Sequence, residues 1–146
     1  MGTITTAMCN SFKQELLGGV HDLDTHSLKL ALIKPSPSGD FNKATTNYSQ
    51  LTGSSDEATG TNYTAGGNVL DSPAIALSGD TATLDFADEV FANLTLSAAG
   101  ALLYNSSASN KAIAVFSFGA TVAATAGDFT VIFPTADASN AVIRIT

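Results

Sequence analysis

The sequence is short of charged side chains. Lys, Arg, Asp and Glu make up only 13% of its 146 residues, about half the share found in ordinary soluble proteins. Ser, Thr, Asn, Ala and Gly take much of their place. A surface with few long charged side chains has less to desolvate and immobilise when another protein covers it. The scarcity of charge therefore favours a protein that contacts other proteins.

Among the charged residues, the six basic ones are outnumbered by 13 acidic ones, and they do not cluster. The formal net charge is −7, which keeps a weakly charged surface soluble. Nucleic-acid binding needs grouped Lys and Arg side chains to neutralise phosphates, so we expect no nucleic-acid partner. The scattered bases are Lys13, Lys29, Lys34, Lys43, Lys111 and Arg144.

Cysteine and tryptophan are almost missing. Cys9 is the single cysteine, so an intrachain disulfide is impossible and a thiolate metal site is nearly excluded. With no Trp, the usual stacking platform for sugars is absent. No apolar run is long enough to span a bilayer, and the first residues lack the basic and apolar parts of a signal peptide. We therefore expect no membrane partner.

The N-terminal part predicts one helix, over residues 5–18. Apolar side chains recur there at intervals of four and form one stripe. Thr5 or Thr6 would cap the helix, and Gly18 with Gly19 would end it. The stripe consists of Met8, Cys9, Phe12, Leu16 and Leu17.

After Gly19 the pattern becomes that of β-strands. A strand is predicted within 27–34, and alternating apolar residues with frequent turn signals fill 67–146. About eight strands result. We expect a mainly β fold, a β-sandwich or jelly-roll-like barrel with the helix packed outside, in a single domain over 1–146.

Residues 36–66 are polar, and a structureless stretch of this length is uncommon inside a compact domain. This excursion either hides a short strand or two, or is an arm that becomes ordered on a neighbouring subunit. Its few anchors are Phe41, Tyr48, Leu51 and Tyr63.

One dense polar cluster could bind a metal. Two imidazoles and two carboxylates could ligate a transition metal or calcium. Their spacing fits no standard site, and Asp side chains in turns usually accept hydrogen bonds from their own backbone. Turn chemistry is therefore favoured, and we expect no metal and no cofactor. The weak candidates are His21, Asp22, Asp24 and His26.

No set of residues predicts catalysis. Asp85, Asp88 and Glu89 could suit glycoside hydrolysis, but Asp85 alternates with apolar neighbours and should face solvent. The histidines are close in sequence and no nucleophile elbow or phosphate-binding loop occurs. We predict no catalytic residues and a protein that is not an enzyme.

Several short sequence segments resemble those of a known group of proteins. Ala7–Asp22, followed by Leu28–Ile33, resembles small virion proteins of tailed bacteriophages, as do Tyr63–Gly67, Ala101–Asn105 and Gly127–Thr130. Some of these proteins resemble capsid cement or decoration proteins, which sit as trimers on the shell. The resemblance implies a β-rich subunit and a symmetric oligomer, without a transferable set of functional residues.

These observations lead to one expected function and one alternative. We expect a decoration protein that is made in the host cytoplasm, binds the major capsid protein on the capsid exterior, and forms a homotrimer. The alternative is a receptor- or carbohydrate-binding module of a tail or head fibre, suggested by the polar excursion and the tyrosines. The expected subunit contacts are Met8, Phe12, Leu16, Phe41, Tyr48 and Tyr63.

Overall fold

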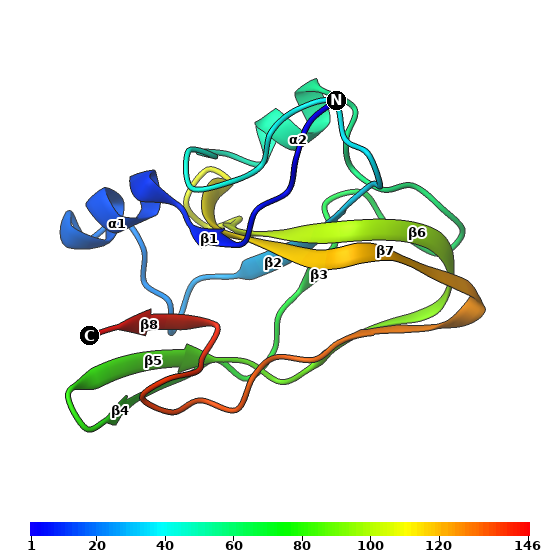
Figure 1. The fold of residues 1–146 in the computed structure, drawn as a ribbon. Coiled ribbons are helices and arrows are strands. Elements are labelled where there is room, and N and C mark those ends of the chain that lie inside the picture. Colours follow the sequence, from blue (N-terminus) through cyan, green and yellow to red (C-terminus); the bar gives the residue numbers. More distant parts are fainter.

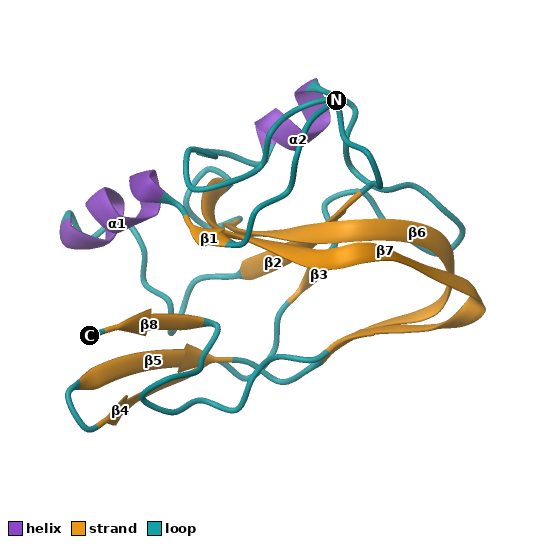
Figure 2. Ribbon diagram, viewed as in Figure 1, coloured by secondary structure: helices purple, strands orange, loops and turns teal.

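The computed structural model describes all 146 residues and is mainly β. Two antiparallel sheets, of five and three strands, are joined by loops and accompanied by two short helices (Figures 1 and 2). The arrangement is sandwich-like, and the expected barrel is wrong because neither sheet closes on itself. The elements are β1 (Ala7–Met8), α1 (Asn10–Leu17), β2 (Leu28–Ile33), α2 (Ser49–Gly53), β3 (Asn68–Val69), β4 (Ala74–Ser78), β5 (Thr81–Asp85), β6 (Glu89–Asn105), β7 (Lys111–Val131) and β8 (Ile143–Ile145).

The five-stranded sheet has the order β1-β7-β6-β2-β3. Strand β2 confirms the prediction for Leu28–Ile33 and pairs along its whole length with residues 100–105 of β6. Five of its six side chains are buried, because neighbouring strands and covering loops remove both faces from water. This strand anchors the core.

Strands β6 and β7 form one long, bent hairpin. The frequent turn signals within 67–146 predict shorter strands, whereas the structure forms two strands of 17 and 21 residues here. The ladder slips at four places, one of them between Ala98 and Gly100. Positive φ angles at Asn93, Gly119 and Ala126 accompany these slips, and such bulges bend a strand pair. The hairpin consequently curves back towards the smaller sheet (Figure 1).

The smaller sheet has the order β4-β5-β8. Strands β4 and β5 are joined by the two-residue loop Gly79-Asp80, and Gly79 has a φ of 60°. A glycine with positive φ at the first loop position is typical of a type II′ hairpin turn. Leu84 and Ile143 bury their side chains and connect this sheet to the main core.

The N-terminal helix is shorter than predicted. Ala7 and Met8 form β1 and pair with Val115 and Ala114 of β7, so the helix begins at Asn10. The capping role expected of Thr5 or Thr6 is therefore wrong. The predicted end is confirmed, with Gly18 as C-cap and Gly19 at a φ of 75°. Leu17, expected on the apolar stripe, is 92% exposed, while Cys9 and Phe12 are fully buried.

The excursion over residues 36–66 folds against the chain's own five-stranded sheet. It contains α2 and forms isolated β-bridges, among them Ile33 with Glu57 and Thr61 with Thr95. Phe41 and Leu51 are buried in the core. The stretch therefore folds within the subunit. Figure 2 shows α2 and its flanking loops above the five-stranded sheet.

Twenty-eight buried apolar residues form one contiguous core. It extends from β2 through the parts of β6 and β7 that lie beside it. At the other end it includes Phe86, Phe91 and Phe129. No helix in the fold has both the length and the apolar character needed to cross a membrane.

Candidate interaction surface

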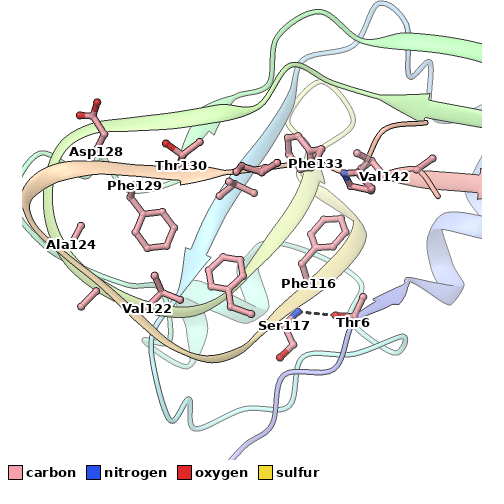
Figure 3. A pocket seen from close by; sticks show the side chains of 16 residues that line it. Thr6, Phe116, Ser117, Val122, Ala124, Asp128, Phe129, Thr130, Phe133 and Val142 are labelled. Atoms are coloured by element: carbon pink, nitrogen blue, oxygen red, sulfur yellow. Dashed lines mark hydrogen bonds between the residues drawn. The ribbon is translucent and has the colours of Figure 1, made fainter. Parts of the chain in front are cut away.

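An open apolar groove lies in the curve of β7. Its volume is about 570 Å³, and eleven of its sixteen lining residues are hydrophobic. One wall comes from residues 116–124, the other from the returning run 128–134, and Val142 adds to one end (Figure 3). A groove of this size and composition can receive an apolar segment of another molecule.

Phenylalanines form the floor and walls of the groove. Phe118 and Phe129 have ring centroids 5.9 Å apart, and Phe129 makes an edge contact with Phe91 at 6.4 Å. Phe129 is nearly buried, while Ile132 at the rim is 75% exposed. Asp128 is the one carboxylate in the lining, and its Oδ1 accepts the backbone N–H of Asn93 at 3.0 Å. The groove therefore offers apolar contact and few free polar groups.

No residue pattern predicts this groove, because it depends on the bend in the hairpin. Residues 111–118 are apolar at nearly every position, a pattern that predicts a central strand covered on both faces. In the structure Phe116 and Phe118 are only partly buried. They lie beside the slip between Ala98 and Gly100, where the β6–β7 ladder is interrupted between Ser117 and Val122.

The residues expected at a subunit interface lie in different surroundings. Phe12 and Phe41 are inside the chain's own core. Met8, Leu16, Tyr48 and Tyr63 are partly buried and pack against that core. Contact of this second group with another subunit stays a prediction.

Two tyrosines and Glu57 form a polar cluster that fixes the excursion. The Glu57 carboxylate accepts hydrogen bonds from the hydroxyls of Tyr48 and Tyr63, at 2.6 and 2.7 Å, and from the Gly66 N–H at 2.7 Å. Tyr48 stacks on Tyr104 with centroids 4.6 Å apart. Burial raises the pKa of each of the three tyrosines, to about 12 for Tyr104. These rings are engaged inside the subunit, which leaves little of them for stacking on a sugar.

Asp56 forms a second internal cluster. Its side chain is fully buried, and its two oxygens accept the backbone N–H groups of Ser38 and Gly39 at 2.7 and 2.8 Å. The Lys34 ammonium lies 3.1 Å from Oδ1. Burial alone would raise the pKa of Asp56, but hydrogen bonds from Ser54, from the two N–H groups and from Lys34 outweigh it and lower the pKa to about 2. Through these hydrogen bonds, the carboxylate holds the loop that follows β2 in place.

The metal candidates take part in turn and packing contacts. Asp22 Oδ1 accepts the backbone N–H groups of Asp24 and Thr25, both at 3.2 Å. The Asn105 side-chain amide lies 3.0 Å from His21 Nδ1 and 2.9 Å from His26 Nδ1. No three His, Cys, Asp or Glu side chains gather as a set of metal ligands.

The acidic residues near the start of β6 each have a separate partner. Asp88 Oδ1 accepts the Phe133 N–H at 2.9 Å, and Asp85 Oδ1 accepts the N–H of Phe86. Glu89 is mostly buried, and Asn68 donates to it at 3.3 Å. Burial raises the pKa of Glu89. Because the three carboxylates serve different contacts, their grouping in sequence does not create a shared site.

Comparison with known proteins adds no assignment: no family model, curated protein or solved structure matches the chain.

Proposed function

We propose that this chain is a structural protein of a tailed-phage virion, a decoration protein that covers and stabilises contacts between major-capsid subunits. The observation that carries the proposal is the open groove rimmed by Phe118, Val122 and Ile132 on a chain with few charges. Contiguous exposed apolar surface on a soluble chain is typical of a protein-binding site.

The use of polar side chains inside the fold also supports a structural role. Asp56, Glu57, Asp88 and Asp128 all accept hydrogen bonds from the chain's own N–H or hydroxyl groups. Carboxylates occupied in this way hold loops in place. The chemistry of the groove suits a peptide segment with aliphatic or aromatic side chains, which an adjoining capsid subunit would supply.

The proposal of a phage particle rests on the resemblance of short sequence segments to small tailed-phage virion proteins. On a capsid, many copies of one weak contact act together because the shell holds them at high effective concentration. A trimer would present three grooves at once. Light scattering tests the trimer directly: we expect three times the 14.8 kDa mass of one chain, and a monomer at all concentrations would contradict it.

Binding to the shell is tested with a matched pair of variants. Ile132→Asp places a charge at the groove rim, and we expect at least a tenfold loss of co-sedimentation with capsids stripped of this chain. Val20→Asp makes the same change at an exposed position after α1, outside the groove, and should bind normally. Equal binding by both variants would contradict the role of the groove.

Cryo-electron microscopy of virions that carry the chain provides the decisive test. We expect density for it on the outer surface at junctions between capsid subunits, with the groove facing the shell. Density confined to a tail or head fibre would refute the decoration role.

A further inference from the structure

Strand β4 is an apolar sheet edge that the fold leaves uncovered. It is the outer strand of the sheet β4-β5-β8. Ala74–Ser78 contains no charged residue, and all of its side chains except that of Ser78 are exposed. Ile75 is 55% and Leu77 77% exposed. An uncharged, exposed edge strand is a template for pairing with another strand.

The register shows which backbone groups are free. Ser78 faces Thr81 across the two-residue loop, and Ala76 faces Thr83. In a hairpin with a two-residue loop, the residues that flank the loop form a hydrogen-bonded pair, and such pairs alternate along an antiparallel ladder. The N–H and C=O groups of Ser78 and Ala76 therefore point to β5. Those of Ile75 and Leu77 point outwards.

The other sheet edges have protection. In the main sheet, β1 and β3 are edge strands of only two residues each. In the smaller sheet, β8 has three residues and carries Arg144, which donates to the Ala138 carbonyl. The free side of β7 is broken by bulges. Short strands, charges and bulges are the usual means of blocking edge pairing, so β4 stands out as the unprotected edge.

We propose that two copies of this chain pair through β4, antiparallel and across a two-fold axis at Ala76. In this register, Ile75 of one copy and Leu77 of the other exchange two hydrogen bonds, and the symmetry repeats them. The two Ala76 residues then form the close, non-hydrogen-bonded pair, where Cα atoms approach to about 4.5 Å. An alanine at the axis permits this approach, so the edge is complementary to itself.

The pairing extends an apolar row across the joined sheet. Residues directly opposite one another in an antiparallel ladder point to the same face. Leu77 therefore shares a face with its partners Ala82 and, one strand further, Ile145, which is 50% exposed. Pairing places Ile75 of the second copy beside Leu77 on that face, so two half-exposed rows become one.

The choice of a second copy follows from the shape of the edge. Pairing cannot continue beyond the five residues, because Pro73 occupies the next outward-facing position and lacks an N–H. A longer foreign strand would gain nothing past this point, whereas an identical strand has the matching length. Two five-residue strands bury much less than the roughly 800 Å² per partner of a stable interface. The contact is therefore weak in dilute solution and strengthens where copies are concentrated, without requiring that the concentrating surface be a capsid.

A cysteine at the axis tests the register. In Ala76→Cys the two thiols lie within reach of a disulfide, which needs Cα atoms about 4.4–6.8 Å apart. The matched control is Ala74→Cys, whose two copies would lie about 13 Å apart, four residues along the strand. Cys9 is fully buried and does not compete. With copper–phenanthroline at millimolar protein, we expect a covalent dimer from Ala76→Cys, at least tenfold more than from Ala74→Cys.

Hydrogen exchange of the unmodified chain gives an independent measurement. The Ile75 and Leu77 amides should exchange several-fold more slowly at millimolar than at micromolar concentration, while those flanking Gly79 should not change. Equal cross-linking at positions 74 and 76, or exchange at Ile75 and Leu77 that is independent of concentration, would overturn the pairing. Both assays omit capsids, so their outcome is separate from that of the shell-binding test.

Discussion

Replacing Asp56 tests whether the buried carboxylate holds the loop after β2. Asp56→Ala removes the acceptor of two backbone N–H groups, those of Ser38 and Gly39. A hydrogen bond to a charged group contributes about 1.5–3 kcal/mol net. Because Ser38 is exposed, water can reach the freed N–H groups, so the lower limit applies to both. The expected loss is about 3 kcal/mol of unfolding free energy.

That loss converts into a measurable change in melting temperature. The entropy of unfolding is about 2.1 cal/mol/K per residue near 60 °C, or roughly 0.3 kcal/mol/K for a chain of 146 residues. Asp56→Ala should therefore melt about 10 °C below the wild type in a thermal scan by circular dichroism at pH 7. Asp24→Ala removes the same charge from an exposed turn residue and should melt within about 2 °C of the wild type.

The pH dependence gives a second test of the same carboxylate. The pKa of Asp56 is lowered from 3.8 to about 2 in the folded chain, so its contribution is complete above pH 4 and is lost as the pH falls towards 2. The difference in melting temperature between wild type and Asp56→Ala should stay constant from pH 7 to pH 4 and shrink below that. A difference under about 3 °C at pH 7, or one that already shrinks at pH 5, would refute the reasoning.

Two further predictions concern the backbone and the tyrosines. Gly67→Ala should destabilise the chain by more than about 3 kcal/mol in urea titration, because Gly67 has a φ of 77° and an added Cβ would overlap the Leu30 carbonyl; Gly53→Ala, with open space around the site, should be neutral, and equal stability of the two variants would contradict this. Burial raises the pKa of all three tyrosines, so the folded chain should show little tyrosinate absorbance at 295 nm at pH 11. Folding favours the protonated rings, so stability is complete below pH 10, the ordinary tyrosine pKa, and falls above it; early absorbance with an intact circular dichroism spectrum would be the contrary result.

Local patterns predicted the elements whose neighbours along the chain determine them. The apolar pattern within 27–34 predicted β2 to within one residue at each end, and the turn residues Ser78-Gly79-Asp80 lie where β4 and β5 form a hairpin. In both cases the side-chain period and the turn residues suffice to specify the conformation. The change from mostly polar to mostly apolar sequence after residue 66 correctly placed most of the strands.

Long-range contacts determined what the sequence could not show. Ala7 and Met8 fit a helical stripe, but pairing with Val115 and Ala114 makes them a strand. The excursion over 36–66 has little periodicity because Asp56 and Glu57 fix it through hydrogen bonds to distant N–H and hydroxyl groups. The groove depends on slips in the β6–β7 ladder, and no residue pattern in either strand predicts these slips. For these features, tertiary contacts override local preference.

The position of β1 also affects how the chain is made. Its two residues leave the ribosome before their partners on β7, which lie more than one hundred positions later in the chain. Synthesis at about 5–20 residues per second delays this pairing by about 5–20 seconds. Until then the N-terminal segment has no sheet to join, and Cys9 and Phe12 remain in water. Closure of the fold is therefore a late event, of the slow kind expected when the decisive contacts join distant parts of a chain.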